Sequence, residues 1–335
     1  MSSIIRTVKG DMPPETLGRT LTHEHLAMDF THFYRKHPKS IDDEFNNGFD
    51  LETIGYIRQY PYSSTSNLVF DDKHAKEYVL RDIKNYKKNG GGTIVENTTE
   101  GLDRDIRFYE TVMRDTGVNI VAGTGFYIAD TQSMTHLHYT KEDLYNHMLT
   151  ELTEGCEDYQ SVKTGFIGEI ASVWPIRDFE RKVILAAGEV QAQIGCGVSF
   201  HPHHVTEAPF EIIRLYMEAG GKIDKAVMSH LDRTLLDPAK LLEFSELGAY
   251  CQFDMFGTEV SYYQLDIDID MPSDAQRLNM ICHLLQEDKA DRILISHDIH
   301  TKHRLVSKNC KMNLKKKVKK GQCPILPCMC RKLIY

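Results

Sequence analysis

The 335-residue chain lacks any long hydrophobic run, and none of its apolar stretches approaches the roughly 20 residues that a bilayer span requires. Residues 1–10 also lack the apolar core of a secretory signal peptide. Mean hydropathy is −0.39. The hydrophobic fraction of 41% is still enough to bury a sizeable core. We therefore expect a soluble, cytoplasmic protein that has no membrane partner.

Most of the chain also lacks the excess of positive charge that nucleic-acid-binding proteins carry. Residues 304–335 hold ten of the 40 basic residues and no acidic residue. The remaining 30 basic residues stand against 48 acidic ones in residues 1–303, a formal charge of −18. This acidic body argues against nucleic acid as the main partner. A small-molecule substrate is the expected partner, and a homodimer is compatible with these features.

Cysteines are few in residues 1–303, and they are widely spaced within apolar or helical stretches. We expect buried free thiols at Cys156, Cys196, Cys251 and Cys282. Four more follow within 21 residues, at Cys310, Cys323, Cys328 and Cys330. A secreted disulfide framework is not expected without a signal peptide, and the spacing of the last four matches no known zinc motif.

Apolar, β-branched segments alternate with amphipathic helical patterns along residues 1–305. Strands are predicted near residues 19–26, 93–97, 119–123, 165–170, 197–201, 226–230, 249–254 and 292–297. Helices are predicted over residues 72–89, 104–116, 141–154, 178–194, 208–219, 237–247 and 273–287. Residues 32–71 are expected to form a long loop with a short helix at 50–60.

This alternation predicts a parallel sheet. At this length the sheet is expected to close into a TIM (β/α)8 barrel, with a doubly wound open sheet as the alternative. No GxGxxG motif opens a helix after the first strand, so the dinucleotide-binding version of the open sheet has no support.

A His-x-His pair ends the first predicted strand, in Leu21-Thr22-His23-Glu24-His25. Residues i and i+2 of a strand face the same side, so His23 and His25 point together. Such a pair alone is more often incidental than metal-binding. Its position favours a metal site, because it closes the first strand of an α/β pattern.

Four further side chains that can bind metal end later strands: Glu169, His201, His230 and Asp298. Glu169 lies inside an apolar run, where a carboxylate is costly unless it is paired or bound to metal. Barrel enzymes build their sites at the C-terminal ends of the strands. Each of these residues could be a hydrogen-bonded core residue, but the six together predict a metal centre.

Several segments resemble the phosphotriesterase family of the amidohydrolase superfamily, and within it the group found in animals. They are VENTT at 95–99, GTGFY at 123–127, GEI at 168–170, FHP at 200–202, SHLDRT at 229–234 and SHDIHTK at 296–302. The resemblance covers roughly residues 5–305 and implies a TIM barrel with two divalent metal ions, expected to be zinc. It assigns His23, His25 and Asp298 to the first ion, His201 and His230 to the second, and Glu169 to both. Glu169 would replace the carboxylated lysine of bacterial members.

The implied reaction is hydrolysis of an ester or amide bond in a small metabolite. Water that bridges two metals loses a proton near neutral pH, and Asp298 would take that proton and pass it to the leaving group. Within the family, an N-acyl amide such as N-acetyltaurine is the favoured substrate. A phosphotriester or lactone hydrolase is one alternative, and a metal-binding protein with weak catalysis is another.

Other residues near the strand ends are weaker candidates. Tyr127 and Trp174 could line the pocket for the substrate or could cap the core. Asp232 and Arg233 are hypothesised to form an ion pair that orients the loop after the sixth strand, or else they cap the next element. Strand alternation turns His297 away from the metals. Loop positions with a solvated or a substrate-facing role are His203, His204 and His300.

The resemblance stops after about Arg304. The family would continue with a last barrel helix, whereas residues 308–335 are lysine-rich and carry no helical period. We expect a barrel over residues 1–305, with its last helix missing or replaced, and a disordered basic tail over 306–335. A frameshift, an alternative exon or a gene-model error is the simplest explanation, and a genuine tail that binds acidic surfaces is the rival. An uncovered flank would loosen the site and weaken catalysis.

Overall fold

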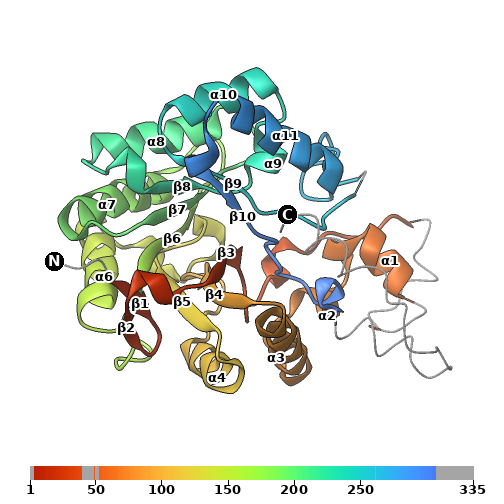
Figure 1. Ribbon diagram of the computed structural model, residues 1–335, viewed down its shortest axis with the longest axis horizontal. Coiled ribbons are helices and arrows are strands. Elements are labelled where there is room, and N and C mark those ends of the chain that lie inside the picture. The colour runs from red at the N-terminus through yellow and green to blue at the C-terminus, as the bar shows by residue number, and fades with distance from the viewer. Residues whose placement is uncertain (1–3, 40–48, 50–52, 261, 307–335) are drawn as a thin grey trace.

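The computed structural model describes residues 4–39, 49, 53–260 and 262–306. Its main feature is an eight-stranded parallel sheet in the order β10-β9-β8-β7-β6-β5-β4-β3 (Figure 1). The strands are β3 (Arg19–Glu24), β4 (Gly91–Glu96), β5 (Asn119–Thr124), β6 (Phe166–Ala171), β7 (Val198–His201), β8 (Ala226–Met228), β9 (Tyr250–Phe253) and β10 (Ile293–Ile295). All eight predicted strands are therefore confirmed, and helices surround the sheet as in a TIM barrel. An antiparallel pair that was not predicted, β1 (Ile5–Thr7) and β2 (Gly10–Met12), precedes the barrel.

The two strands at the ends of the sheet, β3 and β10, lie next to each other. The backbone N–H of His23 donates to Ser296 Oγ at 3.0 Å, and the backbone N–H of Asp298 donates to His23 O at 3.2 Å. These bonds bring the residues after β10 against the end of β3. The sheet is thus nearly closed into a barrel at the point where the predicted His-x-His pair meets Asp298.

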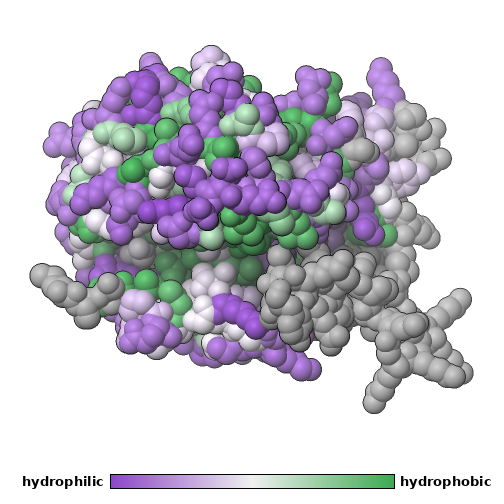
Figure 2. Space-filling model, turned by 45° about the horizontal axis from the view of Figure 1, so that its top comes forward, coloured by the Kyte–Doolittle hydropathy of each residue, from purple (hydrophilic) through white to green (hydrophobic). Residues whose placement is uncertain are grey.

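The seven predicted helices lie outside the sheet: α3 (Lys73–Lys88), α4 (Ile106–Thr116), α6 (Lys141–Thr153), α7 (Asp178–Ile194), α8 (Ala208–Glu218), α10 (Pro238–Glu246) and α11 (Asp274–Gln286). Side-chain caps begin several of them; Asp72 Oδ1, for example, accepts from the backbone N–H of Ala75 at 2.8 Å in α3. Figure 2 shows hydrophilic side chains over most of the visible face, with hydrophobic ones between them. The helices thus turn their apolar faces to the sheet. No helix among the described residues is long and apolar enough to cross a membrane.

Short helices occupy the connections: α1 (Ile54–Gln59), α2 (Thr65–Leu68), α5 (Met134–Leu137) and α9 (Leu231–Thr234). The first of these is the helix predicted at 50–60, of which residues 50–52 lie outside the described part of the chain. After β10 the described chain ends with a 3-10 turn at Lys302–Arg304. The predicted tail falls almost wholly in residues 307–335, outside the described residues. All three residues of β10 are partly exposed, whereas every residue of β6 is buried.

The cysteine expectation is only partly correct. Cys156 and Cys251 are buried free thiols, Cys196 is partly exposed and Cys282 is exposed. Cys282 lies on α11, in a stretch that is apolar in sequence. The prediction was wrong for Cys282 because this helix turns that residue toward solvent.

A buried ion pair links the loop after β4 to α6. The Arg104 guanidinium donates to both Glu151 oxygens, at 2.6 and 2.8 Å, and reaches Glu100 Oε1 at 3.3 Å. Burial raises the pKa of Glu100 to about 7; Arg104 opposes this rise, and the charge of Glu151 adds to it. Glu100 therefore titrates near neutral pH.

Glu100→Gln is expected to raise the melting temperature at pH 8 by roughly 2–4 °C. A gain of about 1 kcal/mol in the free energy of unfolding produces a shift of this size in a domain somewhat smaller than this one. The folded-state pKa of Glu100 lies above its ordinary value, so its protonated form stabilises the folded chain at low pH. That contribution is lost as the pH rises through about 7, and the glutamine variant does not lose it. Differential scanning fluorimetry at pH 5 should show almost no difference. Equal shifts in melting temperature at both pH values would contradict a pKa of about 7 for Glu100. Glu157→Gln, at an exposed position, is the control.

Candidate metal centre

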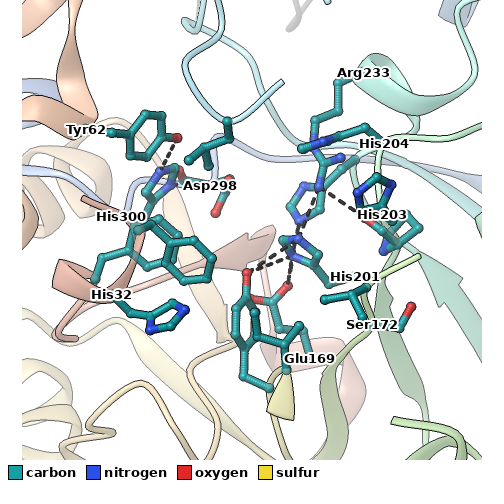
Figure 3. Close-up of a pocket in the computed structure, with 18 of the residues that line it drawn as sticks. His32, Tyr62, Glu169, Ser172, His201, His203, His204, Arg233, Asp298 and His300 are labelled. Atoms are coloured by element: carbon teal, nitrogen blue, oxygen red, sulfur yellow. Dashed lines mark hydrogen bonds and ion pairs between the residues drawn. The ribbon is translucent and has the colours of Figure 1, made fainter. Parts of the chain in front are cut away.

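The structure brings the six predicted ligands together at the C-terminal ends of the strands. Five are almost fully buried, and His201 is partly exposed. Glu169 lies within β6 and His201 ends β7, and Figure 3 shows their side chains facing each other. Gly168, at φ 130°, makes this possible, because a Cβ there would lie 2.6 Å from Ser199 O.

Glu169 occupies the middle of the cluster. Its Oε1 lies 3.4 Å from His25 Nε2. Its Oε2 lies 3.0 Å from His201 Nδ1 and 3.6 Å from His230 Nε2. Oε2 also lies 3.4 Å from His23 Nε2. Glu169 thus contacts histidines of both predicted ligand groups, as a bridging ligand would.

His23, His25 and Asp298 form one part of the cluster. Asp298 Oδ1 lies 3.2 Å from His25 Nε2 and 3.7 Å from His23 Nε2. One ligand atom from each of these residues lies within 4.8 Å of the other two, which is close enough for one ion. The same holds for His23, Glu169 and His230. Two overlapping groups of donors therefore share the cluster.

The side chains present fit divalent metal ions. His23 Nε2 is buried, has no hydrogen-bond partner, and lies 3.4 Å from Glu169 Oε2. An unpaired nitrogen between two carboxylates is a costly arrangement that a cation would relieve. Imidazole and carboxylate donors are also the common ligands of zinc.

The electrostatics of the cluster also favour cation binding. Burial lowers the pKa of His23, His201 and His230, which leaves these rings neutral, as metal ligation requires. Burial alone would raise the pKa of Glu169 and Asp298, but the surrounding histidines hold both values well below the usual range. Burial opposes a charge on His25 as well. Its hydrogen bond to Asp298 and the charge of Glu169 nevertheless raise the pKa of His25 to about 9, and those carboxylates would equally attract a metal.

A second layer of polar groups orients the histidine rings. His230 Nδ1 lies 2.7 Å from Asp254 Oδ1, and His25 Nδ1 lies 2.9 Å from Thr98 Oγ1. His23 Nδ1 contacts Ser229 Oγ at 3.1 Å. Such partners fix the ring orientation and raise ligand basicity.

Glu24, the middle residue of the His-x-His segment, positions Asp298 indirectly. It accepts hydrogen bonds from Ser296 Oγ at 2.8 Å and from the backbone N–H groups of His297 and Ile299 at 2.9 and 3.1 Å. These bonds tie β3 to the residues on both sides of Asp298. His297 Nδ1 also lies 3.2 Å from Glu24, so its ring turns away from the cluster as strand alternation predicts.

A cavity of about 240 Å3 opens over the cluster. Tyr127 lines it, with its hydroxyl 3.4 Å from both ring nitrogens of His201. Trp174 is partly exposed and does not line the cavity, so the structure does not support its predicted substrate role. The three loop histidines, His203, His204 and His300, all line the cavity rather than facing bulk solvent.

The hypothesised ion pair between Asp232 and Arg233 is wrong. Asp232 pairs instead with Arg277 on α11, at 2.7 Å, and both side chains are fully buried. Arg233 turns toward the cavity, where its Nη2 lies 3.1 Å from His201 Nε2. Neighbours in one helical turn point in different directions, and tertiary packing decides their partners.

Comparisons with known proteins agree with this geometry. The model of the phosphotriesterase family matches residues 3–314. Two relatives called phosphotriesterase-related protein, from Drosophila mojavensis and Drosophila melanogaster, are 53% and 52% identical over 306 residues. Each match covers 91% of this chain and 87% of the relative.

Solved structures show the same fold. A resiniferatoxin-binding protein from Rhodobacter sphaeroides has a TM-score of 0.86 at 27% identity, with 91% of this chain and 84% of that one covered. An organophosphorus hydrolase from Deinococcus radiodurans has a TM-score of 0.69 at 26% identity, with coverage of 88% and 79%. A lactonase from Listeria monocytogenes, 22% identical with a TM-score of 0.70, covers 89% of this chain and 83% of its own, and shows the fold alone.

Proposed function

Since the chain belongs to the phosphotriesterase family, and is therefore a metal-dependent hydrolase, we propose that it is a cytoplasmic binuclear zinc enzyme that cleaves N-acyl amides of small metabolites. N-acetyltaurine is the first candidate substrate. His23, His25 and Asp298 would hold one ion and His201 and His230 the other, with Glu169 shared.

One observation carries this proposal: the position of Glu169. Its Oε1 faces His25, and its Oε2 lies within 3.6 Å of nitrogen atoms from His23, His201 and His230. A carboxylate that served only as a hydrogen-bond acceptor would need no ring of histidines. A carboxylate shared by two dications reduces their mutual repulsion and sets their separation.

Two divalent ions in such a site supply a nucleophile at neutral pH and polarise the bond under attack. The chain's own residues then handle protons and position. Asp298 carries its low-pKa carboxylate at the cluster edge, where Oδ1 can accept a proton and return it to the departing amine. His300 Nδ1 donates to the backbone oxygen of Asp298 at 2.8 Å, and its Nε2 accepts from the Tyr62 hydroxyl at 3.2 Å. Asp298 is therefore the residue of this chain that would move the proton.

Cavity size supports a small metabolite over an aryl phosphotriester. The cavity measures about 240 Å3. Drug-sized ligands occupy pockets of about 300–1,000 Å3. A lactone of similar size is the second candidate, because the fold is shared with lactonases and a fold alone does not determine substrate.

Metal content and turnover measured on one purified sample test the proposal. We expect about two zinc ions per chain by plasma mass spectrometry. We also expect N-acetyltaurine to be hydrolysed faster than any lactone or aryl phosphotriester in the same panel. Faster lactone turnover would replace the substrate class but keep the metal centre. Well-folded protein that binds no metal when supplied with zinc would refute the centre, and metal without turnover would favour a binding protein with weak catalysis.

A further inference from the structure

Arg233 is a buried cation with no anionic partner among the described residues. Its side chain lines the cavity and the residue is only 3% exposed (Figure 3). Nη2 donates to Pro202 O at 3.3 Å and lies 3.1 Å from His201 Nε2. Nη1 is buried and has no hydrogen-bond partner.

Two other arginines in the described part of the chain, both with buried side chains, are paired with carboxylates. Arg277 lies 2.7 Å from Asp232, and Arg104 binds both oxygens of Glu151. A buried guanidinium without a counter-charge is costly, so its presence at a cavity wall calls for a ligand that supplies the charge.

The carboxylates that line the cavity are already engaged. Glu169 and Asp298 belong to the metal centre, and Asp130 pairs with Arg177 at 2.7 Å. Asp266, near the cavity, lies 3.4 Å from His204 Nδ1. Each carboxylate that lines the cavity therefore already has a partner or a place in the metal centre.

Binding of metal by His201 would free Arg233 further. If Nδ1 of His201 is a ligand, the proton of that ring lies on Nε2. A protonated Nε2 cannot accept a hydrogen bond from the guanidinium. Arg233 would then retain only Pro202 O as an acceptor, and its fork of N–H groups would be available to an anion in the cavity.

We propose that Arg233 binds an anionic group, a sulfonate or a carboxylate, on the amine portion of the substrate. This inference rests on the proposed function, since it names which N-acyl amides the enzyme selects. Because Arg233 lies against His201, the charge must lie only a few bonds from the amide. The planar fork of arginine suits such bidentate contacts.

Three acetyl amides with the same two-carbon spacer test this selection: N-acetyltaurine, N-acetyl-β-alanine and N-acetylethanolamine. The wild type should prefer the charged amides over the neutral one by about 10–100-fold in kcat/KM, the usual size of a charge-assisted hydrogen bond. Arg233→Met should abolish this preference, and Arg233→Lys should keep part of it. The ratio between sulfonate and carboxylate identifies which anion the site prefers.

Arg35 provides a matched control at the same cavity. It lines the cavity but is exposed, and its Nη1 donates to its neighbour's carbonyl, Tyr34 O, at 3.1 Å. Arg35→Met should change the preference by less than about threefold, because solvent screens an exposed charge. A larger loss in Arg35→Met than in Arg233→Met would overturn the proposal.

Binding without turnover provides a second readout. Ethanesulfonate, which has no amide and coordinates metals weakly, should bind the zinc-loaded wild type in calorimetry and bind Arg233→Met at least about tenfold more weakly. If no amide is hydrolysed but this binding depends on Arg233, the anion site stands and the proposed function fails. The anion site is refuted if the wild type hydrolyses charged and neutral amides equally fast. It is also refuted if Arg233→Met lowers kcat/KM by the same factor on all three acetyl amides. Should the methionine variant fail to fold, an equal loss on charged and neutral amides in Arg233→Lys refutes it.

Discussion

Replacing Glu169 by glutamine is expected to reduce bound divalent metal from about two ions to fewer than one per chain and to lower kcat/KM by at least about 10³-fold. The carboxylate is 1% exposed and lies within 3.6 Å of nitrogen atoms from His23, His25, His201 and His230. Glutamine keeps the volume but removes the negative charge and leaves only one oxygen acceptor. Two dications would then face each other without the shared anion that offsets their repulsion.

The measurement is metal content by plasma mass spectrometry after gel filtration, paired with melting temperature with and without a chelator. Ligand that binds only the folded state stabilises it, so chelation should lower the melting temperature of the wild type and hardly change that of Glu169→Gln. Glu180→Gln is the matched control. Glu180 is fully buried, but its Oε1 accepts only from the backbone N–H of Ala129, at 3.1 Å, a bond that glutamine can keep. Full zinc occupancy in Glu169→Gln would contradict the bridging role.

The ligand cluster could be predicted from sequence because its members share one simple position. Each stands in the last few residues of a strand or shortly after it, and parallel strands in a barrel bring their C-terminal ends together. The alternation of the His-x-His segment also correctly separated His23 and His25 from Glu24. Local pattern and chain topology together therefore give the metal centre without knowledge of any long-range contact.

The residues around the cluster could not be predicted in the same way. Asp254 directly follows β9 and orients His230, but its role depends on a partner 24 residues away. Asp232 pairs with Arg277, which is 45 residues distant, and Arg233 is thereby left without a counter-ion. Trp174, which could line the pocket or cap the core on sequence grounds, does not line the cavity, because position after a strand does not determine where a ring points. Side-chain direction in loops follows from tertiary packing, which no short pattern encodes.

Replacing Asp298 by asparagine is expected to lower kcat by at least about 10³-fold while at least one zinc ion stays bound. Asp298 has φ 51°, in the left-handed region that asparagine also tolerates. Its backbone N–H donates to His23 O, and its backbone oxygen accepts from Arg304 Nη1 at 2.7 Å. These bonds do not involve the side chain, so the variant should keep the loop in place. The amide can still offer an oxygen to metal, but it cannot accept and return a proton.

His297→Asn separates this effect from a general disturbance of the segment. His297 is the adjacent residue, but its ring contacts Glu24 and is 34% exposed, so the loss in kcat should stay below about threefold. Metal content and kcat measured together then decide what Asp298 does. Activity that survives in Asp298→Asn would assign the proton transfer to another group. Loss of all bound metal would show that its charge is needed for ion binding, whereas retained metal with lost turnover identifies the carboxylate as the group that moves the proton.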